Sequence, residues 1–192
     1  MNRQEFEHII RACGAATSCK ELLIVGSQAI LGSVPDSPRE LRVSLELDVS
    51  PIPFSEEAVA IIDGNIGELS QFHKTFYIYA HGVGPDTATV PEDYRTRLVR
   101  VTVGGVTAHC ISPVDLAYSK LAAGREKDLE FVAALLLHKI VRQAPLERLI
   151  APSRAELKKT MEERLQIVST KLALRREAVR QQGRDRGQGM SM

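Results

Sequence analysis

LLIVGSQAILGSVPDSPRELRVSLELDVS, residues 22–50, is the stretch on which the predicted fold of this chain depends. Its first apolar residues, Leu22 to Val25, predict a short buried strand that ends at the small turn residues Gly26 and Ser27. The residues after the turn are compatible with a helix, and a loop with two prolines follows. From Val43 to Val49 apolar and polar residues alternate, which predicts a second strand that the loop must bring alongside the first.

Two acidic residues, Glu46 and Asp48, lie two positions apart on this second predicted strand. Side chains of a strand alternate between its faces, so both carboxylates leave the same face, with Cα atoms about 6.5–7 Å apart. Such a pair suits one or two hard cations such as Mg²⁺. The Gly26–Ser27 turn supplies backbone N–H groups and a hydroxyl for a phosphate group. Metal-binding acids beside a phosphate-binding turn predict nucleotidyl transfer.

Each pattern also has an ordinary structural explanation. The acids would equally form the solvent-exposed face of an amphipathic edge strand, and Gly-Ser would form an ordinary strand-to-helix turn without a ligand. Other phosphate and nucleophile motifs are excluded, because Gly26 begins neither a G-x-G-x-x-G fingerprint nor a P-loop, and no G-x-S-x-G elbow occurs.

The order of motifs continues further along the chain. After the hydrophobic-Gly-Ser turn and the acid-x-acid strand come Ser112–Leu116, Ser119–Leu121 and the block Gly124–Asp128. In this order the sequence resembles nucleotidyltransferase-fold proteins related to AbiEii toxins of bacterial toxin–antitoxin systems, within the DNA polymerase beta-like minimal nucleotidyltransferase superfamily, over roughly residues 22–137. The resemblance implies an α+β fold, with a mixed β-sheet flanked by helices and a helical C-terminal extension.

The resemblance also implies an activity and its partners. A nucleoside monophosphate would pass from a nucleoside triphosphate to an RNA, such as a tRNA 3′ end, or to a protein acceptor. Gly26 and Ser27 would hold the triphosphate, and Lys120 and Arg125 would contact phosphate. A toxin of this kind would have a cognate antitoxin as a further partner.

The same resemblance assigns the catalytic and metal-binding roles. Glu46 and Asp48 would hold Mg²⁺ or Mn²⁺, Lys120 would stabilise the leaving pyrophosphate, and Asp128 would complete the polar site. The superfamily pattern usually has Asp first in the acid pair and a third carboxylate on a later strand. Here the first acid is Glu46, and the hairpin predicted at residues 98–111 carries no acid.

The missing third carboxylate leaves two alternatives open. Glu92 or Asp93 would substitute for it, although both are explained equally well as capping acids. Otherwise the fold is kept and catalysis is lost, so that the chain serves as a binding or regulatory protein.

The chain is expected to have four segments: a nucleotidyltransferase-like core at 1–111, a helical part completing the site at 112–150, a long basic helix at 151–182 and a disordered tail at 183–192. In the core, FYIY at 76–79 predicts a strand, and the glycine-rich segment after it predicts a loop. His81 in that loop either lines the nucleotide site or is a surface histidine, and the second reading is preferred. Gly104-Gly105 predicts a hairpin turn.

Bulk properties narrow the class of protein. The 192 residues carry a net charge of +1, and no apolar run approaches the roughly 20 residues that span a bilayer. No signal-peptide pattern is present at the start, so a cytoplasmic, non-membrane protein is expected. The three cysteines form no C-x-x-C pair, which favours a reducing compartment, and with His109 they match no zinc-binding spacing.

The C-terminal part is basic. Residues 151–192 contain ten Lys and Arg against five Asp and Glu, whereas the rest of the chain is net acidic. This segment would contact RNA phosphates or form a solvated helix face. Its apolar stripe would pack on its own domain or on a partner helix, which allows an oligomer; the stripe comprises Leu157, Met161, Leu165, Val168, Leu172 and Ala173.

Overall fold

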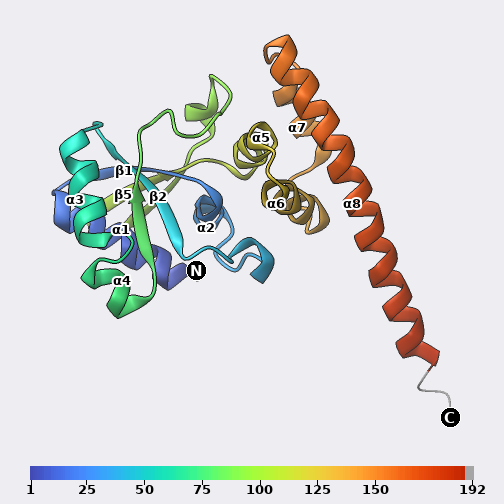
Figure 1. Ribbon diagram of the computed structural model, residues 1–192, viewed down its shortest axis with the longest axis horizontal. Helices are drawn as coiled ribbons and strands as arrows, with labels where there is room; N and C mark the ends of the chain where they lie inside the picture. Colours follow the sequence, from blue (N-terminus) through green and yellow to red (C-terminus); the bar gives the residue numbers. More distant parts are fainter. Residues whose placement is uncertain (189–192) are drawn as a thin grey trace. The chain divides into compact units, whose positions relative to one another are not determined.

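The computed structural model describes residues 1–188, with Arg176 and residues 178–188 described by their backbone alone. By its internal contacts the chain divides into two compact units, Met1–Ser119 and the part from Lys120 onwards. The first unit is an α+β fold built on a five-stranded mixed sheet with the strand order β3-β2-β1-β5-β4, which confirms the predicted fold class (Figure 1).

The first unit mixes helices and strands along the chain. They are α1 Arg3–Thr17, β1 Glu21–Val25, the 3-10 turn η1 Ser27–Ala29, α2 Ile30–Ser33, η2 Arg39–Leu41, β2 Glu46–Ile52, α3 Glu56–Ile66, α4 Gln71–Phe76, β3 Tyr79–Gly82, η3 Tyr94–Arg97, β4 Val99–Val103, β5 Val106–Cys110 and α5 Pro113–Ala123. The last turn of α5 belongs to the second unit, which continues with α6 Glu126–Leu137, α7 Gln143–Ile150 and α8 Ala155–Gln188.

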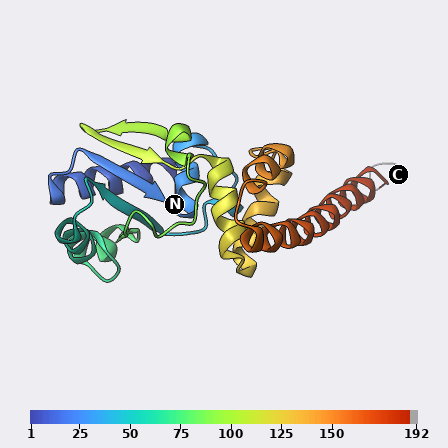
Figure 2. The same ribbon diagram turned by 90° about the horizontal axis from the view of Figure 1, so that it is seen from above.

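The sheet is built around β1. Strand β1 pairs antiparallel with β2 and parallel with β5, so it receives hydrogen bonds on both edges. Strand β2 pairs in parallel with β3, and β4 and β5 form the hairpin turned by Gly104 and Gly105. Figure 2 shows this hairpin, in yellow-green, beside the blue strand β1. Strand β1 is the central strand of the sheet, which explains why Leu22 to Val25 are all buried.

The register separates the side chains of the sheet into an apolar and a polar face. Helices α1 and α3 cover the apolar face: a Cβ on Gly14 of α1 would lie 2.3 Å from Val106, and one on Gly82 would lie 2.8 Å from the carbonyl oxygen of Val59 in α3. The residues of this face are Leu22, Ile24, Leu47, Val49, Ala80, Ala108 and Cys110, all at most 1% exposed. The opposite, polar face carries Glu46, Asp48, Tyr79, His81, Thr107 and His109 alongside the buried Leu23 and Val25 of β1.

Several elements form where local signals predicted them. Strand β1 and the Gly104-Gly105 hairpin agree with prediction, and both glycines have positive φ, as such a turn requires. The Ser55 side chain accepts a hydrogen bond from the Ala58 N–H and caps α3. Ser112 caps α5 in the same way through the Asp115 N–H.

Two predictions about strands were wrong. Residues 76–78 are not in a strand, because the aromatic segment ends helix α4, and β3 begins only at Tyr79. The second strand was predicted from Val43 to Val49, whereas β2 begins at Glu46 and continues through Pro51 to Ile52. Strand β3 ends opposite Val49, so Pro51 has no neighbour on that side and is tolerated there as on an edge strand.

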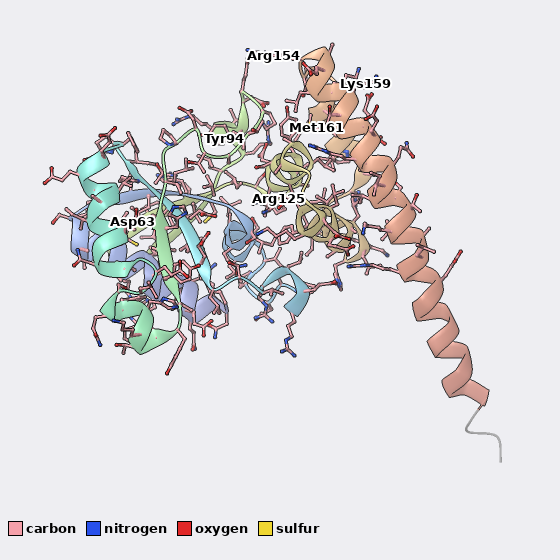
Figure 3. All side chains as sticks on the ribbon, in the orientation of Figure 1. Asp63, Tyr94, Arg125, Arg154, Lys159 and Met161 are labelled. Carbon is pink, nitrogen blue, oxygen red and sulfur yellow. The ribbon has the colours of Figure 1, made fainter. Side chains whose placement is uncertain are left out.

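The second unit is a helical assembly in which α8 packs against α6 and α7. The stripe of α8 is buried within its own unit at Met161, Leu165, Val168 and Leu172. Figure 3 shows Met161 on the inner side of α8 and Lys159 on the outer side. Lys171 and Arg175 pair with Glu130 of α6, so part of the basic charge of α8 is already neutralised.

Helix α8 extends through Gln188, past the end predicted at residue 182, so residues 183–188 of the predicted disordered tail are helical. Residues 189–192 lie outside the described part of the chain. The finer division of the chain into four segments stays a prediction. Within residues 1–188, none of the helices combines the length and the apolar character needed to cross a bilayer.

Candidate active site

The acid pair lies on the polar face of β2. Leu47 and Val49 point into the core on the other face and are fully buried, which directs Glu46 and Asp48 together to the opposite side. The side chain of Asp48 retains 23% of its exposure. The acids are therefore neither buried in the core nor free in bulk solvent.

Gly26 lies in contact with this acid pair. Val25 is directly opposite Asp48 in the β1–β2 ladder, and the chain turns at Gly26 with φ +67°. A Cβ at Gly26 would lie 1.8 Å from the Asp48 Oδ2 atom. Both the positive φ and this close approach require glycine. The turn after the first buried strand and the acid pair thus share one site.

The helix after this turn is shorter than predicted. Ser27–Ala29 form a 3-10 turn, and α2 is a single turn, Ile30–Ser33. So short a helix has little cooperative dipole. Phosphate binding here would therefore depend on individual N–H groups and on the Ser27 hydroxyl.

Strand β3 places a second pair of polar side chains beside the first. Tyr79 is opposite Glu46, and His81 is opposite Asp48, in the parallel register. The Tyr79 hydroxyl donates a 3.0 Å hydrogen bond to Glu46 Oε2. His81 Nδ1 lies 3.4 Å from Asp48 Oδ1, and the His81 side chain is 54% exposed.

The surroundings of the acid pair disfavour the charged form of Asp48. Burial and the neighbouring Glu46 carboxylate raise the pKa of Asp48 to about 6, while His81 acts in the opposite direction. Burial and the bond to Glu46 raise the pKa of Tyr79 to about 12, so its hydroxyl stays protonated and keeps donating. Two carboxylates with so few donors around them form a site that a cation would stabilise.

The donor set fits a divalent cation. One ligand atom from each of Glu46, Asp48 and His81 lies within 4.8 Å of the other two. Among the residues that the structure describes, no other group of three or more His, Cys, Asp or Glu side chains has such spacing. The group excludes Asp93, which instead pairs with Arg97. Arg97 also bonds the fully buried Asp115, so these three residues form a structural ion-pair network.

An open hollow of about 330 Å³ adjoins the acid pair. It is lined by Glu46, Asp63, Gly67, Glu68, Tyr79, Ala80 and His81. Asp63 of α3 (labelled in Figure 3) accepts a 2.7 Å hydrogen bond from the Gly82 N–H and so ties α3 to β3. The hollow therefore has a wall held in place by a specific bond.

The other predicted site residues form a separate cluster in the second unit. Lys120 Nζ lies 2.9 Å from Asp128 Oδ1, and Arg125 Nε lies 2.6 Å from Asp128 Oδ2. Asp128 is only 1% exposed, and Lys120 also lies 5.7 Å from the centre of the Phe131 ring. Burial tends to raise the pKa of Asp128, but the hydrogen bonds from Arg125 and Lys120 outweigh it and hold the pKa below its usual value.

The turn between α5 and α6 positions this cluster, and Arg125 lies in it (Figure 3). Gly124 adopts φ +70° there and divides the two helices. A Cβ at Gly124 would lie 2.1 Å from the guanidinium of Arg164 in α8. Arg164 Nη1 donates 2.7 Å bonds to the carbonyl oxygens of Leu121 and Ala122 and so caps the end of α5.

The predicted site residues thus form two groups, each within its own unit. Gly26, Ser27, Glu46 and Asp48 lie in the first unit, and Lys120, Arg125 and Asp128 in the second. Sequence reasoning missed Tyr79 and undervalued His81, which is in a strand and not in the predicted loop. Tyr79 and His81 are two positions apart in the sequence, as Glu46 and Asp48 are. This spacing points to a shared site only when the register of β2 and β3 is known.

Comparison with known proteins identifies the family. No curated protein and no solved structure matches the chain. A sequence model of one family, described as nucleotidyltransferase of unknown function (DUF6036), matches residues 6–181. That range includes both side-chain clusters and nearly all of the described fold, so the chain belongs to this nucleotidyltransferase family.

Proposed function

We propose that the protein transfers a nucleoside monophosphate from a nucleoside triphosphate to an RNA or protein acceptor at the acid pair on β2. The observation that carries this proposal is the contact between Gly26 and the Asp48 carboxylate. It brings a tight turn to the acid pair in a chain that belongs to a nucleotidyltransferase family.

The geometry supports a role for each of these residues in the first unit. Glu46 and Asp48 would hold Mg²⁺ or Mn²⁺, and the Tyr79 hydroxyl orients the Glu46 carboxylate. A divalent ion bound there would neutralise triphosphate charge and lower the pKa of the incoming hydroxyl. Because Gly26 has no side chain, the Asp48 carboxylate can approach the backbone of the turn closely. The backbone N–H groups and the Ser27 hydroxyl of this turn would donate to the triphosphate.

The reaction needs no covalent intermediate on the protein. An acceptor hydroxyl attacks the α-phosphorus, a new P–O bond forms, and the bond to the β-phosphate breaks to release pyrophosphate. Positioning and electrostatics supply most of the acceleration in phosphoryl-type transfer. The absence of a nucleophilic Cys or Ser motif is consistent with such a mechanism.

The sequence resemblance assigns phosphate contacts to Lys120 and Arg125. Their bonds to Asp128 support a positioning role for that carboxylate, since it holds both cations. Lys120 would then stabilise the charge that develops on the leaving pyrophosphate.

The finer proposal is an AbiEii-related toxin that acts on a tRNA 3′ end and is restrained by a cognate antitoxin. Its support is the order of motifs at residues 22–137 together with the basic charge of residues 151–192. Expression of such a toxin would arrest growth, and Lys120→Ala would relieve the arrest. Arrest that Lys120→Ala leaves unchanged would remove the support for this finer proposal.

The test of transfer uses purified full-length protein, α-labelled nucleoside triphosphates, Mg²⁺ or Mn²⁺, and bulk tRNA. Label should enter RNA or protein, and Asp48→Asn and Glu46→Gln should each reduce transfer about a hundredfold or more, because metal binding contributes several kcal/mol to such reactions. Glu21→Gln is the matched control, since Glu21 is an acid of the same sheet outside the ligand group. Equal transfer by wild type and Asp48→Asn would contradict the proposed function.

A second candidate is a nucleotide-binding regulatory protein without catalysis. The observation that favours it is the composition of the ligand group, which contains only two carboxylates and no third acid. In this case labelled triphosphate would bind in a metal-dependent way and Asp48→Asn would abolish binding, but no label would be transferred.

A further inference from the structure

We propose that His81 is the third protein ligand of the metal site and that the site therefore selects Mn²⁺ over Mg²⁺. This inference rests on the proposed function, because it concerns the ion that Glu46 and Asp48 would hold. It replaces the missing third carboxylate with a nitrogen donor and assigns a chemical preference to the site.

The register of the sheet builds this donor set. Strands β2 and β3 run parallel, with Glu46 opposite Tyr79 and Asp48 opposite His81. Paired residues of neighbouring strands point to the same face. Backbone pairing therefore directs His81 to the same side as the two acids.

The distance between His81 and Asp48 suits two ligands of one ion. Nδ1 of His81 and Oδ1 of Asp48 are 3.4 Å apart, which is long for a hydrogen bond. Two donors that are each about 2.2 Å from an ion, at a right angle to each other, lie about 3.1 Å apart. The His81 ring is more than half exposed, so it can adjust its angle without disturbing the core.

Glu46 has the outer-shell support that metal ligands usually have. The Tyr79 hydroxyl donates to its Oε2 atom and leaves Oε1 available. Tyr79 itself packs against the His73 ring, with ring centres 4.7 Å apart. Hydrogen bonds to ligand carboxylates fix their orientation and strengthen binding.

The mixed donor set favours a transition-metal ion such as Mn²⁺ over Mg²⁺. Mg²⁺ prefers oxygen ligands and water, whereas imidazole favours transition metals. Of the two ions proposed for the site, Mn²⁺ shares with Mg²⁺ the preference for carboxylates, but as a transition metal it loses less when one ligand is a nitrogen. Two carboxylates and a neutral imidazole also balance the charge of a divalent ion.

The chain offers a matched control histidine. His109 Nε2 lies 3.4 Å from Glu21 Oε1, the same separation as in the His81–Asp48 pair. Like His81, it is on the polar face, but only one acid accompanies it there, and it is outside the ligand group. His109→Asn therefore removes an imidazole beside a carboxylate without removing a proposed ligand.

The experiment titrates Mn²⁺ and, separately, Mg²⁺ into full-length protein by calorimetry. Wild type and His109→Asn should bind Mn²⁺ more tightly than Mg²⁺. His81→Asn should lose about tenfold or more in Mn²⁺ affinity and much less in Mg²⁺ affinity. His81→Asp should shift the preference towards Mg²⁺, because it supplies a third oxygen ligand.

A spectroscopic measurement tests the ligand directly. Bound Mn²⁺ should show electron spin-echo modulation from an imidazole nitrogen in wild type and in His109→Asn, and His81→Asn should lose it. Persistence of this modulation in His81→Asn, or unchanged Mn²⁺ affinity, would overturn the inference and leave the proposed function intact. If neither ion bound wild type, or if Asp48→Asn bound both ions as wild type does, the proposed function would also lose its metal site.

Discussion

The two clusters of predicted site residues place an aspartate in opposite electrostatic environments. Asp128 accepts bonds from Lys120 and Arg125, which hold its pKa below the usual value. Asp48 lies beside a second carboxylate, and its pKa is raised to about 6. A satisfied carboxylate stabilises its own unit, whereas a crowded one costs stability until a cation arrives. The contrast marks β2 as the place where a ligand is expected.

The largest expected effect is the loss of the satisfied carboxylate. Asp128→Asn removes the charge that neutralises Lys120, which is only 14% exposed. Breaking a buried ion pair from one side is strongly destabilising, so the free energy of unfolding should fall by about 3 kcal/mol or more. Urea unfolding followed by circular dichroism measures it. A change below about 1 kcal/mol would mean that the pair is not buried in solution.

Acid should remove this difference between wild type and Asp128→Asn. The pKa of Asp128 is lowered by folding, so its contribution is present above the unfolded pKa of about 3.9 and is lost as the pH falls through the lower folded value. The unfolding midpoints of the two proteins should therefore converge below about pH 4. Asp36→Asn, at an exposed loop aspartate, is the control. A gap that stays constant down to pH 2 would contradict the assignment.

Gly26→Ala should have the next largest effect. The left-handed backbone costs a side chain about 1–2 kcal/mol, and the new Cβ would meet the Asp48 carboxylate. We expect a loss of about 2 kcal/mol in stability together with loss of metal binding. Gly64→Ala is the control, because a Cβ there meets no atom within 4 Å. Normal Mn²⁺ titration by Gly26→Ala would show that the contact with Asp48 does not shape the site.

Asp48→Asn should change stability in the opposite direction from Asp128→Asn. Without added metal, the neutral amide removes the repulsion with Glu46, and the free energy of unfolding at pH 8 should rise by about 1 kcal/mol. With saturating Mn²⁺ the order should reverse, because only wild type gains stability from binding. Destabilisation by Asp48→Asn in chelator would show that the two carboxylates do not repel each other.

The smallest effect is expected at the exposed partner of Asp128. Arg125 is 62% exposed, and ion pairs of exposed groups contribute about 1 kcal/mol or less. Arg125→Ala should therefore cost much less than Asp128→Asn in the same urea experiment. A cost equal to that of Asp128→Asn would show that Arg125, and not Lys120, is the main partner of the carboxylate.

Local signals in the sequence were sufficient for much of the fold. The apolar run of β1 and the Gly104-Gly105 turn each act within a few residues, and both formed as predicted. The caps at Ser55 and Ser112 are local in the same way. The strand predicted at 76–79 was wrong for residues 76–78, and it was predicted because aromatic residues favour strands. In the structure, Phe72 and Phe76 of α4 pack on the His8 ring of α1, a contact that no local pattern announces.

The same distinction applies to the candidate site. The acid pair and the Gly26 turn were predictable because alternation and turn chemistry are local. His81 and Tyr79 were not, since their position beside the acids depends on the β2–β3 register. Local sequence also does not reveal that the space beside Gly124 is filled by Arg164, a residue forty positions later.

The Arg164 guanidinium has a consequence for the folding of the chain during its synthesis. The carbonyl groups of Leu121 and Ala122, in the last turn of α5, accept hydrogen bonds from Arg164 in the N-terminal third of α8. A nascent or truncated chain ending before Arg164 would leave the end of α5 open and the cluster around Asp128 loosely held. The basic C-terminal helix therefore completes the packing of its own unit. Truncated proteins that lack Arg164 should be less stable than those that keep it.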